Sequence, residues 1–180
     1  MSASSAGLPR GIDHIGMTVP DLEAAARFLT EAFGAVALYD NVTEDDPQQG
    51  PDAEETLGLP PGTSVQHMRM MRLGNGPSIE LFEMRSPASR QKAAIASDYG
   101  LQHFAVYVDD VDAAVARFEA AGGHVLTAPK ELLGIEKGAG NAFCYGRTPW
   151  GGLVELISWP GEAPWERTAP APRYRPPPRD

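Results

Sequence analysis

Cysteine is almost absent from this chain, which has a single one, Cys144, among its 180 residues. One cysteine excludes an intramolecular disulfide framework and a zinc site built from several thiolates. Long apolar runs are missing as well, since no stretch reaches the roughly 18 residues typical of a membrane-spanning helix. Residues 1–11 also contain no apolar segment of signal-peptide length. These absences predict a cytoplasmic protein with no membrane partner.

Basic residues are fewer than acidic residues in this chain. The chain carries 15 Lys and Arg residues against 24 Asp and Glu residues, which gives a formal net charge of -9. Nucleic acids and anionic membranes are bound through basic surfaces, so this balance argues against both kinds of partner. Hydrophobic residues make up 42% of the chain and charged residues 22%. Such a composition is typical of a globular protein with one domain, or with two small halves that share a core.

Three segments are expected to lie outside the regular fold. Residues 160–180 hold a series of prolines, which cannot donate backbone hydrogen bonds, and they predict an extended or disordered C-terminal arm. Residues 40–62 are rich in Pro, Gly, Asp and Glu and predict a long loop that shapes specificity. Residues 1–10 are small and polar and predict a disordered N-terminus.

The sequence contains an internal repeat. Residues 13–35, DHIGMTVPDLEAAARFLTEAFGA, match residues 102–124, QHFAVYVDDVDAAVARFEAAGGH. Each copy has a histidine, an extended apolar stretch, an acidic turn, an Ala-rich helix and a glycine, and each is followed by a later strand with a Glu-Leu pair, SIELFE or LVELIS. A repeat that occurs only twice suggests a duplicated module. We therefore predict two similar modules, residues 11–87 and 101–159, joined by a linker at 88–100.

Each module is predicted to run strand, helix, then about three strands. Asp21 can cap the first helix, which is expected to end at Gly34. Asp109 or Asp110 can cap the second helix, and Gly122 stops it. Alternating hydrophobicity predicts strands at 12–19, 65–73, 78–84, 101–108, 123–127, 141–147 and 153–158, with one more at 36–40.

Two histidines and two glutamates occupy equivalent places in the two copies. His14 and His103 lie on the first strand of each module, and Glu80 and Glu155 lie on the last. Because side chains alternate across a strand, each of the four lies opposite a mainly aliphatic face. The aliphatic faces suit the Ala-rich helices, so the other faces are left to line an open cavity. Two imidazoles and two carboxylates that converge there would form a divalent-metal site.

Other side chains near these strands are weaker candidates. Tyr107 has the same strand parity as His103, so it is a possible proton donor or substrate contact, or else part of the cavity wall. Tyr145 and Arg147 share one face of a nearby strand and could contact a substrate.

The strand at 65–73 carries a further pair. His67 and Arg69 lie on one of its faces, where they could bind an anionic substrate or form a solvated edge. Glu83 has the opposite parity to Glu80, so we do not predict that it is a metal ligand.

The motifs resemble those of the vicinal oxygen chelate superfamily, which includes glyoxalase I, methylmalonyl-CoA epimerase, extradiol dioxygenases, and fosfomycin and bleomycin resistance proteins. The resemblance covers residues 11–159 and is carried by DHIGMTVPDLEAAARF, SIELFE, LQHFAVYVDDVDAAVARFEAAGG and PWGGLVELIS. It implies an α+β fold in which two βαβββ modules form an open, cup-shaped mixed sheet with helices on the convex side. The phrase MRLGNGPSIELFEM is most similar to the branch that contains the 2-epi-5-epi-valiolone epimerases.

The resemblance also implies a ligand set. His14, Glu80, His103 and Glu155 match the four metal ligands of glyoxalase I, and the metal would be Zn, Ni, Co, Mn or Fe. Extradiol dioxygenases use only the positions of His14, His103 and Glu155, and bleomycin resistance proteins lack the set. Two-module relatives are often dimers, so we expect a homodimer. The site could form within one chain or across that dimer.

Such a metal would polarise a carbonyl of a small oxygenated substrate and stabilise the enolate formed by loss of a neighbouring proton. Glu80 or Glu155 is the predicted base, and Tyr107 is the third catalytic candidate. Epimerisation, isomerisation or a glyoxalase-like lyase reaction would follow. Two alternatives remain: an Fe(II) extradiol-type dioxygenase, which four protein ligands disfavour by crowding the metal, and a protein that sequesters a drug-like molecule without turnover.

Overall fold

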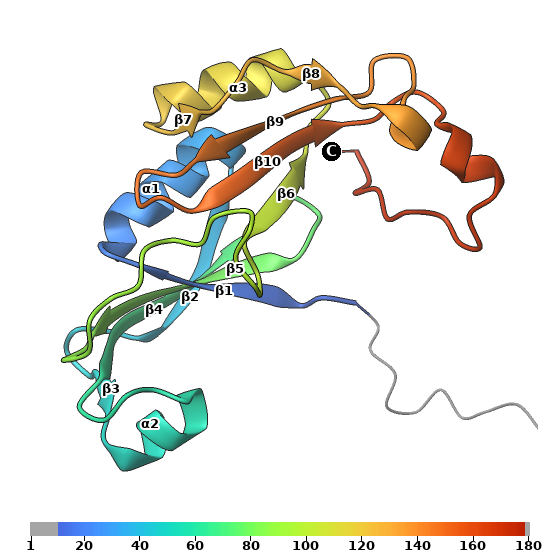
Figure 1. The fold of residues 1–180 in the computed structure, drawn as a ribbon. Helices are drawn as coiled ribbons and strands as arrows, with labels where there is room; N and C mark the ends of the chain where they lie inside the picture. The colour runs from blue at the N-terminus through green and yellow to red at the C-terminus, as the bar shows by residue number, and fades with distance from the viewer. Residues whose placement is uncertain (1–10, 179–180) are drawn as a thin grey trace, which may run out of the picture.

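Figure 1 shows the computed structural model, which describes residues 11–178. The first half of the chain contains β1 (His14–Val19), α1 (Leu22–Phe33), β2 (Val36–Val42), β3 (Gln48–Gln49), α2 (Pro51–Leu57), β4 (Ser64–Arg72) and β5 (Ser78–Arg85). The second half contains β6 (His103–Tyr107), α3 (Val111–Ala120), β7 (His124–Val125), β8 (Lys130–Glu131), β9 (Ala142–Arg147) and β10 (Leu153–Ser158), with short 3-10 turns η1 (Gly134–Glu136) and η2 (Pro164–Arg167).

Each half forms one five-stranded sheet. The strand order is β1-β5-β4-β2 in the first sheet and β6-β10-β9-β7 in the second, with β3 paired to β4 and β8 paired to β9. In both sheets the first strand of the module pairs in parallel with the last, and the remaining pairs are antiparallel. The predicted α+β fold, with two similar modules in open mixed sheets, is confirmed.

Carboxylate caps start the two longer helices as the sequence predicts. Asp21 accepts a hydrogen bond of 2.8 Å from the backbone N–H of Ala24, and Asp110 accepts one of 2.9 Å from Ala113. Of the two residues proposed for the second helix, Asp110 is therefore the cap. Gly34 ends α1 in the left-handed region, at φ 66, where a residue without Cβ is favoured.

One hydrophobic core lies beneath both sheets. Helices α1 and α3 pack against each other and against strands of their own modules, as Figure 1 shows. Phe118 of α3 is fully buried, and its ring contacts Phe28 and Phe33 of α1 at centroid distances of 5.4 and 5.8 Å. Because α1 and α3 cover the aliphatic faces, the His and Glu faces of the sheets point away from these two helices.

The segment at 40–62 has more regular structure than the continuous loop expected for it. Strand β2 runs to Val42, β3 pairs with β4, and α2 begins with Pro51. Proline is favoured in the first helical turn, and Gly58 ends α2 in the left-handed conformation at φ 64. The same residue types that suggested a loop thus mark the two ends of a helix.

The chain beyond β10 is extended apart from η2, and it turns back toward the two sheets (Figure 1). Residues 1–10, for which disorder was predicted, lie outside the described residues. No helix within residues 11–178 has the length and apolar character needed to cross a membrane.

Candidate functional site

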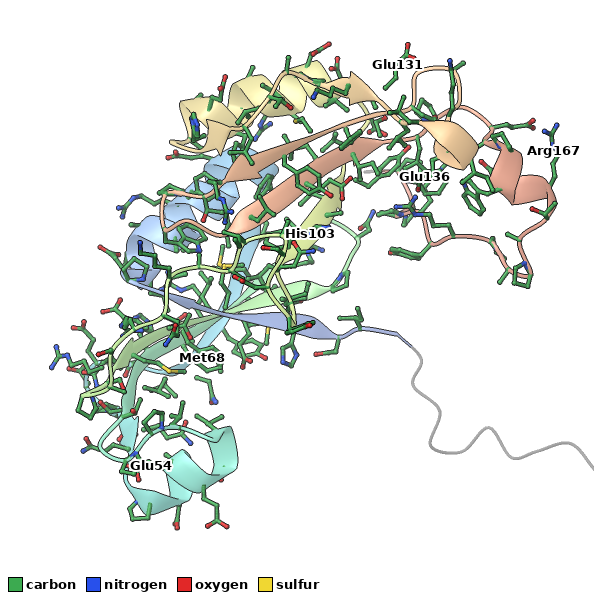
Figure 2. All side chains as sticks on the ribbon, viewed as in Figure 1. Glu54, Met68, His103, Glu131, Glu136 and Arg167 are labelled. Carbon is green, nitrogen blue, oxygen red and sulfur yellow. The ribbon has the colours of Figure 1, made fainter. Side chains whose placement is uncertain are left out.

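The four predicted ligands occupy matching positions in the two sheets. In both parallel strand pairs, the glutamate lies two residues beyond the position opposite the histidine. His14 Nε2 is 3.3 Å from Glu80 Oε2, and His103 Nε2 is 3.4 Å from Glu155 Oε2. In the view of Figure 2, His103 lies between the ribbons of the two sheets. The internal repeat therefore builds the same His–Glu pair twice.

In each module, the side chain of the residue before the histidine forms a hydrogen bond with the ring nitrogen Nδ1 of that histidine. Nδ1 of His14 is 2.7 Å from Asp13 Oδ1, and Nδ1 of His103 is 2.9 Å from Gln102 Oε1. An acceptor at Nδ1 favours the tautomer that carries its proton there, which leaves the Nε2 lone pair free to bind a metal. The hydrogen bond that His14 donates to Asp13 is also the main reason why the pKa of His14 is raised. Sequence analysis missed both partners, although they directly precede the histidines.

The four side chains come together as two pairs. Within residues 11–178, no group of three or more His, Cys, Asp or Glu side chains is close enough to hold a metal ion. The donor chemistry fits a divalent transition metal, because each pair offers an imidazole nitrogen beside a carboxylate whose side chain is only 18% or 13% exposed. A single shared cation stays a prediction, and it requires the two pairs to approach each other.

Tyr145 lies beside the second pair. On β9 it stands directly opposite Glu155, and its ring contacts that of His103 edge-on at a centroid distance of 5.4 Å. Burial, the negative charge of Glu155 and a hydrogen bond to it raise the pKa of Tyr145, so the phenol keeps its proton at neutral pH. The sequence indicated only that Tyr145 lies on one face of the predicted strand at 141–147. The strand register that places it opposite Glu155 is visible only in the structure.

Tyr107, the predicted third catalytic residue, has different neighbours. Its ring packs edge-on against Trp159 at a centroid distance of 5.7 Å, and it lines a cavity together with residues of the C-terminal arm. Its catalytic role stays a prediction, and Tyr145 is the tyrosine in contact with a His–Glu pair.

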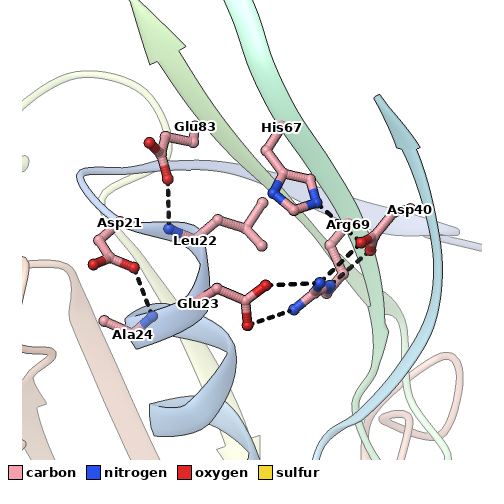
Figure 3. Close-up of polar contacts among 8 residues, drawn as sticks. All are labelled: Asp21, Leu22, Glu23, Ala24, Asp40, His67, Arg69 and Glu83. Carbon is pink, nitrogen blue, oxygen red and sulfur yellow. Dashed lines mark hydrogen bonds and ion pairs between the residues drawn. The ribbon is translucent and has the colours of Figure 1, made fainter. Parts of the chain in front are cut away.

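Arg69 and His67 belong to an ion-pair network on the helix-facing side of the first sheet (Figure 3). Arg69 donates to both carboxylate oxygens of Asp40, at 2.6 and 2.8 Å, and pairs with Glu23 of α1 at 2.9 Å. His67 Nε2 lies 2.9 Å from Asp40. Two carboxylates already neutralise the guanidinium, so this cluster connects β2, β4 and α1 and does not offer a free cation to a substrate.

The side chains of two other candidates, Glu83 and Arg147, form hydrogen bonds with backbone groups. Glu83 accepts a hydrogen bond of 2.8 Å from the N–H of Leu22 at the start of α1, which agrees with its exclusion from the ligand set. Arg147 donates to the carbonyl oxygens of Ala94 and Gly151, at 2.9 and 2.7 Å. Arg147 therefore holds the linker between the modules against the turn that joins β9 to β10.

Asp40→Asn is expected to lower the free energy of unfolding by about 1 to 3 kcal/mol at neutral pH, because a hydrogen-bonded charge is lost. Arg69 and then His67 hold the pKa of Asp40 at about 2, below its ordinary 3.8. A lowered pKa stabilises the fold fully above the ordinary value, and the contribution disappears as the pH falls from 3.8 toward about 2. Urea unfolding across this pH range measures the effect. Asp45→Asn, at an exposed acid outside the network, is the control, and an equal loss there would contradict the assignment.

Comparisons with known proteins agree on one family. The family model for the Glyoxalase/Bleomycin resistance protein/Dioxygenase superfamily matches residues 13–145. The chain is 34% identical over 172 residues to a 2-epi-5-epi-valiolone epimerase from Actinomyces sp, which covers 94% of this chain and 92% of the relative. It is 29% identical over 145 residues to an ethylmalonyl-CoA/methylmalonyl-CoA epimerase from Cereibacter sphaeroides, covering 81% and 95% of the two chains.

The fold gives the same result. The crystal structure of a glyoxalase family protein from Bacillus cereus superposes with a TM-score of 0.68 at 21% identity, covering 87% of this chain and 98% of that one. The resemblance drawn from the motifs is confirmed, and the named epimerase relatives make this an enzyme of the epimerase or glyoxalase type. The chain therefore belongs to the glyoxalase/bleomycin resistance protein/dioxygenase superfamily.

Proposed function

We propose that this chain is a divalent-metal-dependent enzyme that transfers a proton at the carbon next to a carbonyl, and so epimerises or isomerises a small oxygenated substrate. The observation that carries the proposal is the His–Glu pair that recurs in both modules at the same register, with Nε2–Oε2 distances of 3.3 and 3.4 Å. His14, Glu80, His103 and Glu155 would hold the ion. When bound, a divalent cation supplies Lewis-acid polarisation of the carbonyl.

The two modules divide the proton transfer between them. Glu80, on the first sheet, takes the proton from the substrate carbon, because a carboxylate near the carbonyl is a suitable base. Glu155 is paired with the protonated Tyr145 on the second sheet. The hydroxyl of Tyr145 can give its proton to the other face of the same carbon, and exchange with solvent then removes the proton from Glu80 and restores the one on Tyr145. Epimerisation needs a donor and an acceptor on opposite faces of the carbon, and one His–Glu pair from each module would supply them once the two pairs approach each other.

Two substrates follow from the relatives' names. We propose 2-epi-5-epi-valiolone and methylmalonyl-CoA as the first compounds to test, since the matched relatives are named as epimerases of these classes. The metal-loaded protein is incubated with each compound in D2O, and mass spectrometry measures deuterium at the carbon next to the carbonyl. Exchange that stops on metal removal supports the proposal. Exchange that survives metal removal contradicts metal dependence, and tight binding without exchange would favour a sequestering protein.

The variant Glu80→Gln distinguishes the proposed role of Glu80 as a base from its proposed role as a metal ligand. The amide keeps the side-chain volume and one oxygen donor but cannot accept the proton. We expect the variant to retain metal while the exchange rate falls roughly 100-fold or more. Metal content and the deuterium exchange rate are measured on the same preparation. An unchanged exchange rate would remove Glu80 from the role of base.

Tyr145→Phe is expected to lower kcat roughly 100-fold, because the phenol that returns the proton is lost. Metal binding and KM should change little, since the phenyl ring keeps its edge contact with His103. Tyr107→Phe is the matched control, as that tyrosine packs on Trp159 instead. Steady-state kinetics of both variants decide between the two tyrosines, and a larger loss of kcat in Tyr107→Phe would reverse the assignment.

We also propose that the chain forms a homodimer. Val36, Leu38 and Tyr39 are 48%, 50% and 54% exposed on β2, which lies at the edge of the first sheet. Exposed apolar side chains on an edge strand favour association with another chain. Light scattering on the purified protein measures the mass.

A further inference from the structure

Two cavities occupy equivalent places in the two modules. The first, of about 430 Å³, lies between the β4–β5 turn at 73–77, the ends of β6 and β10, and the C-terminal arm at 173–178. The second, of about 470 Å³, lies between Trp150 in the β9–β10 turn, the ends of β1 and β5, residues within 86–93 that follow β5, and residues within 59–63 that follow α2. In each case, the segment that follows the last strand of one module closes a space against the last hairpin turn of the other.

The C-terminal arm is held in place as a wall of the first cavity. The hydroxyl of Tyr174 donates to the carbonyl oxygen of Asn75 at 3.1 Å. The side-chain amide of Asn75 donates in return to the carbonyl oxygens of Pro177 and Pro178, at 3.3 and 3.2 Å. The arm therefore spans from the second module to the first, and it places its own side chains in the cavity lining.

An arginine fastens each covering segment to the module that it follows. Arg175 donates to the carbonyl oxygen of Trp159, directly after β10, at 2.6 Å. Arg90 of the linker donates to the carbonyl oxygen of Met84 in β5. The repeat thus extends beyond the sheets to the segments that cover the cavities.

Arg175 gives the first cavity a positive charge that no acidic side chain within the described part of the chain neutralises. Its guanidinium lies 3.9 Å from the ring centroid of Trp159 and 5.9 Å from that of Tyr107. Within residues 11–178, no carboxylate is within ion-pair distance of Arg175, whereas Arg173 pairs with Glu136 at 3.0 Å. One hydrogen bond to a carbonyl leaves most of the guanidinium donors available, and their fork geometry matches phosphate and carboxylate oxygens.

We propose that this cavity binds the phosphate or carboxylate group of a small molecule, with Arg175 as the charged contact. Tyr107 and Trp159 line the same space, and the Trp159 ring supports the Arg175 guanidinium from one side. The cavity volume lies within the range of roughly 300 to 1,000 Å³ typical of small-molecule sites. Of the described residues in the lining, Asp109 is the one acid and Arg173 is already paired with Glu136, so Arg175 is the guanidinium available to an anion. The site contains none of the four proposed metal ligands and does not depend on the proposed reaction.

Nuclear magnetic resonance of the full, metal-free chain tests the proposal. Sodium phosphate and, separately, sodium malonate are titrated at constant ionic strength while the indole N–H of Trp159 and the Nε–H of Arg175 are followed. We expect saturable shifts with at least one anion, and the comparison shows whether phosphate or carboxylate is preferred. Arg175→Ala should weaken the affinity about 10-fold or more, as expected for loss of a charged hydrogen bond. Arg85→Ala removes one exposed positive charge outside the lining and should leave the affinity unchanged.

A second variant distinguishes the effect of the Arg175 charge from the effect of the position of the C-terminal arm. Tyr174→Phe removes the hydrogen bond to Asn75 but keeps Arg175, so anion affinity should stay close to that of the unmodified chain. No saturable shift with either anion would overturn the proposal. Equal weakening by Arg175→Ala and Arg85→Ala, or by Arg175→Ala and Tyr174→Phe, would also overturn it, because the effect would then be general screening or loss of the arm.

Discussion

His103→Ala is expected to abolish divalent-metal binding by the whole chain and to lower kcat/KM roughly 100- to 1,000-fold, the equivalent of losing several kcal/mol of charge stabilisation. The proposed ion is shared, so removal of one imidazole from either module should release it. His14→Ala should therefore have the same effect as His103→Ala. Elemental analysis and calorimetric titration give the stoichiometry, for which we expect one ion per chain before substitution and none afterwards.

The stoichiometry also tests the alternative arrangement. The two pairs are separate in the structure, and each offers one nitrogen and one carboxylate. If each pair bound its own ion, the chain would hold two ions, and each single variant would keep one. That result would contradict the shared site. His124→Ala, at an exposed histidine on β7, is the control and should leave metal content and turnover unchanged.

Phe118→Ala is expected to cost about 3 to 5 kcal/mol of unfolding free energy, the range for truncation of a buried aromatic side chain. Phe118 has no exposed surface, and its ring joins Phe28 and Phe33 across the contact between α1 and α3. Two glycines pack directly against it, since a Cβ on Gly123 or Gly146 would lie 2.3 or 2.6 Å from the ring. No side chain at either glycine can move in to fill the space.

Urea unfolding monitored by circular dichroism measures this loss. Leu133→Ala removes an apolar side chain that is 76% exposed, and it should change stability by less than about 0.5 kcal/mol. A loss below about 1 kcal/mol for Phe118→Ala would mean that the two helices close over the vacant space. A large loss would show that the joint core of the modules depends on this ring.

Local patterns were sufficient to place the four candidate ligands at equivalent strand positions of the two modules, although one four-ligand site was predicted and the structure shows two pairs. The parity of His14 and Glu80 on their strands depends only on alternation, and the repeat confirmed the same positions at His103 and Glu155. The separation of the two pairs could not be predicted, because it depends on how the two sheets are placed relative to each other, which strand alternation does not encode.

Contacts between distant parts of the chain are the other reason why the structure differs from the sequence-based predictions. The place of Tyr145 beside Glu155 depends on the antiparallel register of β9 with β10. Prolines predicted an extended arm but not its direction, which is fixed by a hydrogen bond between Tyr174 and Asn75, 99 residues apart. The sequence did not predict the helix within 40–62, because proline is typical of loops, although it also suits the first turn of a helix, as Pro51 does in α2.

The equivalent cavities bear on how this chain evolved. An ancestral single module that paired with itself would have had two identical hollows, each closed by its own tail. After fusion, the tail of the first module became a connection that must reach β6, whereas residues 173–178 follow β10 and connect no two strands of the described sheets. Substitutions within 173–178 can therefore alter the chemistry of one hollow without disturbing the connection, which gives each half of the protein an independent route to change.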